Sequence, residues 1–383
     1  MTPIYLDHNA TTPIDADVLK AMLPYLRDEF GNPSSAYALG RRARDAVETA
    51  RAEIAALIGA HADEIVFTSG GTEANNIAIR GAVRSRLGRH GVVTTAIEHP
   101  ATDECCRLLE RDGHSVHRIA PTSDGRVDPD TVITALSADT ALVTVIHGQN
   151  EIGTLQPVTD IAAAAQARGA LIHIDAAQTL GKITVDVGAL GVDLLSIAGH
   201  KLYAPKGIGA LYVRRGVDLP PLLVGAGQEH GRRPGTENVA SIVALGTACR
   251  IAADNVEHEQ VRLGNLSDDL LARLKRAVPD LVLVGHPDIR LPNTLNVLFP
   301  GASGRAVLEA CPRVFASTGS ACHAGSEEPS AILTALGIPR DVALRAVRLS
   351  LGRGTTADDV EGAASSLAAA WRLVSASRAA AVA

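Results

Sequence analysis

The sequence predicts an α/β protein in two parts, a large domain built on a mostly parallel sheet and a smaller α+β domain. Two observations carry this prediction. Strand-like and helix-like segments alternate from residue 64 to residue 213, and this order changes after about residue 255. The chain of 383 residues, 46% of them hydrophobic, has room for two or three domains and can fill a sizeable core.

Two helices are expected before the alternation begins. Asp15 is a suitable N-cap for a helix over residues 16–30, which Gly31 ends. In residues 37–58, apolar side chains recur at three- and four-residue steps, and Gly59 stands where a C-cap is expected.

The alternating segments follow in order. The expected strands are residues 64–68, 91–97, 115–119, 141–146, 171–175, 192–197 and 208–213. Helices are expected over residues 73–87, 101–111 and 158–168. Such alternation is typical of a parallel sheet flanked by helices.

The smaller domain is expected to begin with a helix over residues 256–278. Strands near residues 281–284 and 294–299 follow, then another helix and a Gly/Ser/Ala stretch around Cys322. A last helix is expected from Ala357.

Composition excludes several classes of function. A net charge of −6 gives no basic surface for nucleic acid, and no stretch approaches the roughly 18 consecutive apolar residues of a membrane span. The first residues have no basic segment or apolar signal core, so a cytoplasmic protein is expected. Five cysteines, an odd number without C-x-x-C spacing, argue against a disulfide framework and against a zinc site, and no metal is expected. Four of them are expected to pack as small hydrophobes, namely Cys105, Cys106, Cys249 and Cys311.

Small residues follow the first strand and open directly into a helix. In the segment T68-S-G-G-T-E-A-N75, free backbone N–H groups around Gly71 and Thr72 and the helix dipole suit a phosphate. The alternative is an ordinary Ser/Thr helix cap. The segment matches neither the P-loop nor the dinucleotide-binding pattern.

Further polar residues stand just after other strands, where open α/β sheets bind ligands. His99, Asn150 and Asp175 each follow a strand, and Gln178 comes three residues after Asp175. A buried Asp175 could pair with a pyridinium nitrogen, although a turn cap is an equal alternative. Lys201 lies in a loop between two strands, where burial would lower its pKa, and the alternative is a solvated loop lysine. Together these residues predict a pyridoxal phosphate pocket.

Ten motifs, in order along the chain, resemble those of the cysteine desulfurases of the NifS and IscS kind, which belong to the class V aminotransferases. The matching residues are 5–13 (YLDHNATTP), 31–35 (GNPSS), 68–73 (TSGGTE), 98–99 (EH), 150–153 (NEIG), 173–178 (HIDAAQ), 199–203 (GHKLY), 233–238 (RPGTEN), 320–322 (SAC) and 347–353 (VRLSLGR). The resemblance implies the pyridoxal-phosphate fold of type I, with a seven-stranded sheet in a large domain of residues 13–257. The small domain would comprise residues 1–12 and 258–383.

The resemblance also implies a role for each matching residue. Lys201 would form the Schiff base with pyridoxal phosphate, Asp175 would pair with the ring nitrogen, and His99 would stack on the ring. Gln178 and Asn150 would lie near the phenolic oxygen. Gly71, Thr72 and His200 would bind the phosphate, with Thr236 supplied by the other subunit of a homodimer. Arg348, together with Asn150, would bind the substrate.

Cys322 is the expected sulfur acceptor, in a mobile loop at about residues 317–328 that has no apolar side chain larger than alanine from 317 to 326. The resemblance implies that L-cysteine is converted to alanine, that Cys322 keeps the sulfur as a persulfide, and that an acceptor protein for iron–sulfur or tRNA thiolation receives it. His99 is a candidate acid/base. Ala198 replaces a serine common in the family, which removes one phosphate ligand. His323 leaves open a selenocysteine lyase, and a sulfur-delivery docking platform is an alternative from another class.

Overall fold

The computed structural model describes residues 3–319 and 328–382. Its main feature is a seven-stranded sheet in the order β2-β8-β7-β6-β5-β3-β4. The strands are β2 (Ile65–Thr68), β3 (Gly91–Thr95), β4 (Ser115–Ile119), β5 (Thr140–Ile146), β6 (Leu171–Asp175), β7 (Leu194–Ala198) and β8 (Gly209–Val213). Only β8 runs antiparallel to its neighbours in this sheet, so the predicted mostly parallel arrangement is confirmed.

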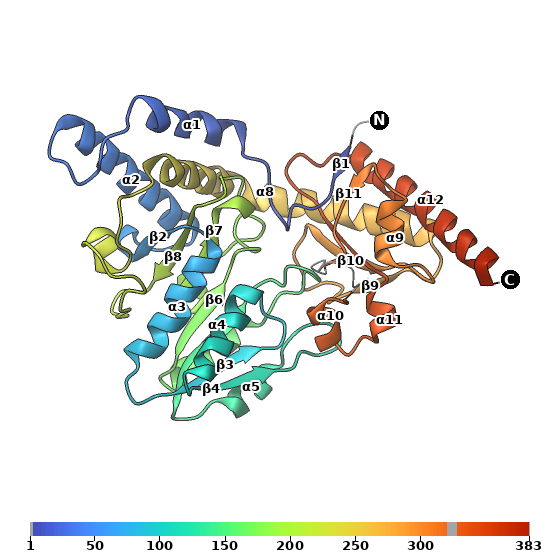
Figure 1. The fold of residues 1–383 in the computed structure, drawn as a ribbon, viewed down its shortest axis with the longest axis horizontal. Helices are drawn as coiled ribbons and strands as arrows, with labels where there is room; N and C mark the ends of the chain where they lie inside the picture. Colours follow the sequence, from blue (N-terminus) through green and yellow to red (C-terminus); the bar gives the residue numbers. More distant parts are fainter. Residues whose placement is uncertain (1–2, 320–327, 383) are drawn as a thin grey trace.

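Helices cover both faces of this sheet (Figure 1). Alternate residues of each strand enter two different hydrophobic clusters, as in β2, where Phe67 packs on one face and Val66 on the other. The hydrophobic cluster on the first face includes side chains of α1 (Ala16–Arg27), α2 (Ala38–Leu57), α5 (Pro129–Ala135), α6 (Val158–Ala167) and α7 (Val187–Leu190), and α1 itself packs mainly on the long helix α8 (Val239–Ala277). The second face is covered by α3 (Gly71–Ser85) and α4 (Pro100–Arg111).

A smaller region holds two further sheets. One is antiparallel, with the order β12-β10-β9, and the other pairs β1 with β11 in parallel. The strands are β1 (Ile4–Tyr5), β9 (Val282–Val284), β10 (Thr294–Leu298), β11 (Val314–Phe315) and β12 (Ala346–Ser350). The helices of this region are α9 (Gly304–Glu309), α10 (Ala331–Ala335), α11 (Arg340–Ala343) and α12 (Ala357–Val382).

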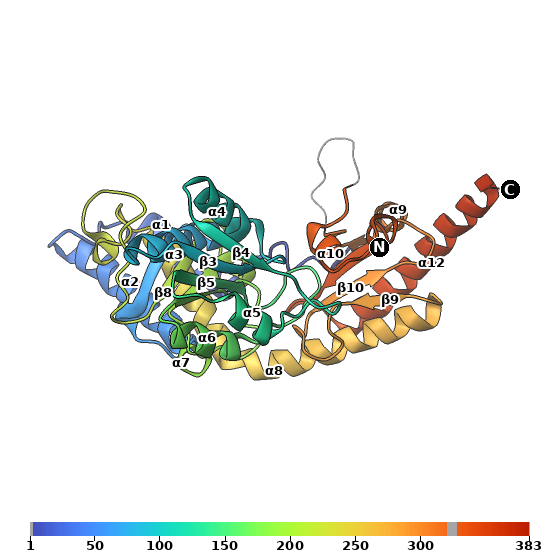
Figure 2. The same ribbon diagram turned by 90° about the horizontal axis from the view of Figure 1, so that it is seen from below.

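The helix expected to begin at residue 256 begins much earlier. It is α8 (Val239–Ala277), a single 39-residue helix, and Figure 2 shows it running beneath both regions. Ile242 and Leu245 belong to the core of the large sheet, whereas Leu263 and Leu270 belong to the core of the small region. By length and composition α8 could cross a membrane, yet 67% of its most apolar window is buried inside the protein, as in a core helix.

The other predicted elements are found close to their expected positions. Asp15 caps α1 by accepting a hydrogen bond from the backbone of Asp17, although α1 ends at Arg27 rather than near residue 30. Gly59 adopts the left-handed conformation (φ 68°) after α2, as a C-cap glycine does. The four cysteines predicted to pack as hydrophobes are all buried. Among the described residues, no cluster suited to a metal ion is present.

Candidate active site

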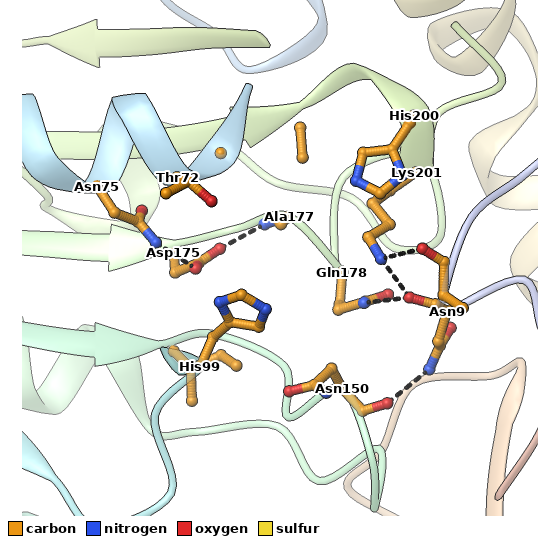
Figure 3. A pocket seen from close by; sticks show the side chains of 14 residues that line it. Asn9, Thr72, Asn75, His99, Asn150, Asp175, Ala177, Gln178, His200 and Lys201 are labelled. Carbon is orange, nitrogen blue, oxygen red and sulfur yellow. Dashed lines mark hydrogen bonds between the residues drawn. The ribbon is translucent and has the colours of Figure 1, made fainter. Parts of the chain in front are cut away.

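A cavity of about 290 Å³ opens at the carboxyl ends of the parallel strands. Figure 3 shows its walls, to which loops after β2, β3, β5, β6 and β7 all contribute. It is lined by Asn9, Ala10, Gly71, Thr72, Asn75, His99, Ile146, Asn150, Asp175, Ala177, Gln178, Ala198, His200 and Lys201. Eight of the residues predicted for the site are in this list, so residues spread over 130 positions of sequence meet where the sheet topology predicts.

One end of the cavity is the N-terminus of α3. Gly70 (φ 150°) turns the chain from β2 into the helix, and Gly71 and Thr72 form its first turn. The first N–H groups of a helix have no partner within it, and they lie at the positive end of the helix dipole. A Cβ atom on Gly71 would come within 3.3 Å of the Ala198 Cβ, so small side chains keep this end open. The arrangement suits a phosphate.

Asp175 ends β6 and is buried at the side of the cavity. Its Oδ2 accepts a hydrogen bond of 2.7 Å from Asn75 Nδ2, and its Oδ1 accepts one of 3.0 Å from the backbone N–H of Ala177. Both bonds hold the carboxylate in one orientation. The carboxylate is therefore placed to bind a positively charged or N–H group inside the cavity.

His99 caps α4 and also lines the cavity. Its Nδ1 accepts a hydrogen bond of 3.1 Å from the backbone N–H of Ala101. Burial lowers the pKa of His99 below its ordinary value, and Lys201 acts in the same direction, whereas Asp175 opposes them. A neutral ring with Nδ1 as acceptor carries its hydrogen on Nε2. His99 can thus donate from Nε2 and presents a flat, uncharged ring to a ligand.

Lys201 lies opposite Asp175, in the short helical turn that follows β7. Its Nζ donates hydrogen bonds to the backbone carbonyls of Asn9 and Ala10, the latter at 2.7 Å. Burial, followed by the positive charge of Arg348, lowers the pKa of Lys201 to about 8, although Asp7 and Asp175 act in the opposite direction. This shift confirms the expected direction and leaves a substantial share of neutral, nucleophilic amine near pH 8.

A match to a family model covers residues 4–362, almost the whole chain, and the family is described as aminotransferase class-V. The chain belongs to this family.

Curated relatives of this class-V aminotransferase include a cysteine desulfurase from Nostoc sp., 45% identical over 94% of this chain and 91% of the relative. The cysteine desulfurase NifS of Azotobacter vinelandii is 43% identical over 94% of this chain and 90% of the relative. Among solved structures, one called NIFS-like protein superposes with a TM-score of 0.90 at 32% identity, covering 96% of this chain and 99% of its own.

Two described residues predicted for the site of this class-V aminotransferase, Arg348 and Thr236, lie outside the cavity lining. Arg348, on β12, donates to Asp7 Oδ1 at 2.6 Å and to the Asn150 carbonyl at 3.2 Å, so it stands behind the cavity wall. Thr236 is exposed and lines a separate cavity with Arg233. Cys322 lies outside the described residues.

Sequence reasoning did not assign a role to several residues of the pocket and its wall. Asn75 lies one turn after Gly71 on the same helix face, so helical spacing in the quoted motif could have found it. Asn9 and Ala10 belong to the first quoted motif, but their contact with Lys201 joins segments about 190 residues apart. Lys182 is buried behind Gln178, and nothing in its sequence neighbourhood indicates this position.

Proposed function

We propose that this chain is a pyridoxal-phosphate-dependent cysteine desulfurase that converts L-cysteine to alanine. The observation that carries the proposal is the pairing, across one cavity, of a lysine with a lowered pKa and a buried carboxylate held by two donors. A carboxylate at a pyridinium nitrogen keeps pyridoxal phosphate an electron sink, and a neutral lysine amine is the group that bonds to its aldehyde carbon.

The residues around the cavity fit this cofactor. Gly71, Thr72 and His200 would hold the phosphate at the start of α3, and Asp175 would bind the ring nitrogen. Burial lowers the pKa of His200 to about 4, so it would offer a neutral imidazole to the phosphate. When bound, the cofactor supplies an electron sink that makes the Cα proton of an attached amino acid acidic. Because Ala198 has no hydroxyl to donate to the phosphate, more of the hydrogen bonds to the phosphate would come from the backbone N–H groups of α3.

The protein's own groups account for the remaining steps. Lys201 lines the cavity and would serve as the base for the substrate's Cα proton, and His99 can donate a hydrogen bond from Nε2. The Arg348 Nε is buried and has no partner among the described residues, so its N–H can donate a hydrogen bond to a carboxylate oxygen of the substrate. The Cys322 thiolate would attack the substrate sulfur, which breaks the C–S bond and leaves a persulfide on Cys322.

The curated relatives described above are called cysteine desulfurases, which favours this reaction over a selenocysteine lyase. The lined cavity favours an enzyme over a docking platform without catalysis. The direct test is to supply the purified protein with pyridoxal phosphate, L-cysteine and a reducing thiol. We expect alanine and sulfide in equal amounts, and a higher rate on L-cysteine than on L-selenocysteine. A protein that binds no cofactor, or that releases no alanine, would contradict the proposal.

We also propose a cytoplasmic homodimer that passes its sulfur to an acceptor protein. Thr236 is exposed, away from the cavity of its own chain, as a residue that completes a partner's phosphate site must be.

Thr236→Ala is expected to weaken cofactor retention by roughly fivefold, the effect of one lost hydrogen bond, without changing the dimer. Fluorescence titration of the cofactor and light scattering check this. Thr134→Ala, at an exposed position of α5, is the matched control. A fully active monomer would exclude the dimer.

A further inference from the structure

A second lysine is buried behind the cavity wall. Lys182 lies in the turn after β6, where the backbones of Leu180 and Ile183 form an isolated β-bridge. Only 7% of Lys182 is exposed. Its Nζ donates one hydrogen bond of 2.8 Å to Gln178 Oε1 and one of 3.1 Å to Asn9 Oδ1. Both acceptors are side-chain amide oxygens, which carry no charge.

The number of these bonds matches an uncharged lysine. An ammonium group has three N–H donors, whereas a neutral amine has two, and the described residues provide two acceptors for Lys182. Burial lowers the pKa of Lys182 well below its ordinary value, and the positive charges of Lys201 and Arg348 lower it further. His8, the other titratable group facing Lys182, is itself buried, and its pKa is lowered to about 4. Lys182 is therefore a buried hydrogen-bond donor whose two acceptors carry no charge.

Gln178 has one orientation that suits its surroundings. Its Oε1 faces the Lys182 amine, and its Nε2 donates to the Asn9 backbone carbonyl at 3.1 Å. The amide nitrogen has two N–H groups, and Asn9 uses one, so the second is available to the cavity that Gln178 lines. Without Lys182, the Gln178 Oε1 would be a buried acceptor without a hydrogen-bond donor. The free-energy cost of such an unpaired group is large enough to make the Gln178 amide rotate to another orientation.

We propose that Lys182 is a positioning residue that aims the Gln178 N–H into the cavity, where it donates to the phenolic oxygen of the bound cofactor. This inference rests on the proposed function and extends it to a residue outside the cavity lining. Lys182 acts through Gln178 and touches neither cofactor nor substrate. The same amine also holds the Asn9 side chain, whose Nδ2 donates to the Asn150 carbonyl at 3.0 Å, so it ties the N-terminal segment to the pocket.

The test is a pH titration of the visible absorption band of the cofactor-loaded protein. The midpoint reports loss of the proton from the Lys201 nitrogen that is bonded to the cofactor. Loss of that proton leaves the negative charge of the phenolic oxygen without a positive neighbour. An N–H group that donates to this oxygen stabilises the charge, so it lowers the pH of the midpoint. Lys182→Met, which has a side chain of similar length and no donor, is expected to raise the midpoint by about one unit. Lys182→Gln retains an N–H donor, so its midpoint is expected to lie close to that of the wild type.

Two further variants separate positioning from a general disturbance. Gln178→Ala removes the amide, so adding Lys182→Met to it should move the midpoint no further. Lys206→Met removes an exposed lysine near Lys201 and should leave the midpoint unchanged. An unchanged midpoint in Lys182→Met, or an equal shift in the Gln178→Ala background, overturns the proposal.

If Lys182→Met does not fold, Lys182→Gln decides. A midpoint near that of the wild type supports the proposal, and one equal to that of Gln178→Ala overturns it. A wild-type protein without any visible band would instead overturn the proposed function, and this inference with it.

Discussion

Lys201→Ala is expected to lower turnover of L-cysteine by at least about 10³-fold, within the range for loss of a positioned base, while some cofactor remains bound. The variant loses both the nucleophilic amine and the base, because Lys201 supplies the amine of lowered pKa. The α3 N-terminus and Asp175 remain to hold the phosphate and the ring. The wild type should be yellow, and borohydride should bleach it and add the cofactor mass to the chain. The variant should gain no such mass.

Lys206→Ala is the matched control, because Lys206 is exposed and lies five residues from Lys201. It should keep its yellow colour and most of its turnover. A Lys201→Ala variant that retained a tenth of the wild-type rate, or that still became covalently labelled, would mean that another amine bonds to the cofactor. Lys182 would then be the first residue to examine, since burial gives it a lowered pKa as well.

Cys322→Ala is expected to abolish cysteine turnover while the cofactor spectrum still responds to added L-cysteine. A thiolate leaves carbon poorly, so cleavage of the substrate C–S bond needs a second sulfur nucleophile to attack the substrate sulfur. A selenol is more acidic and its bond to carbon is weaker, so cleavage of selenocysteine needs less help. The variant should therefore keep much of its selenocysteine activity. Alanine release from both substrates measures the difference.

Cys311→Ala provides the control, because it removes a buried thiol from the small region without touching the cavity. It should lose some stability and retain the ratio of the two activities. Desulfuration of cysteine by Cys322→Ala at the wild-type rate would show that Cys322 is not the acceptor, and the persulfide step would be wrong.

The sheet and most of its helices could be predicted because their hydrophobic patterns have clear periods. The first half of α8 could not, since a helix buried on most sides has no polar face and so no amphipathic stripe. Residues 239–252 include buried Val239, Ile242, Leu245 and Cys249, and they pack mainly against α1 and α2 in the core of the large region. Only the more polar second half shows the pattern that predicts a helix from the sequence.

The cavity could be predicted because parallel strands place their carboxyl ends at one edge, so each polar residue after a strand was a candidate. Contacts that cross between segments could not. The Asn75–Asp175 bond joins residues 100 positions apart, and the Lys182–Asn9 bond joins residues 173 apart. The hydrogen-bond partners of Lys182 and the tautomer of His99 depend on such contacts, so they follow only from the folded chain.

The continuous α8 also limits how the protein can come apart. Because its first half is buried with the large sheet and its second half with the small one, neither core can open fully without unwinding part of a shared helix. Unfolding of one region would strip apolar side chains from the other, and this couples the two in a single cooperative unit. A cut near residue 257, where the two domains were expected to meet, would leave two fragments that each expose half of a buried helix. We therefore expect the two regions to unfold together, because each buries one half of the same helix.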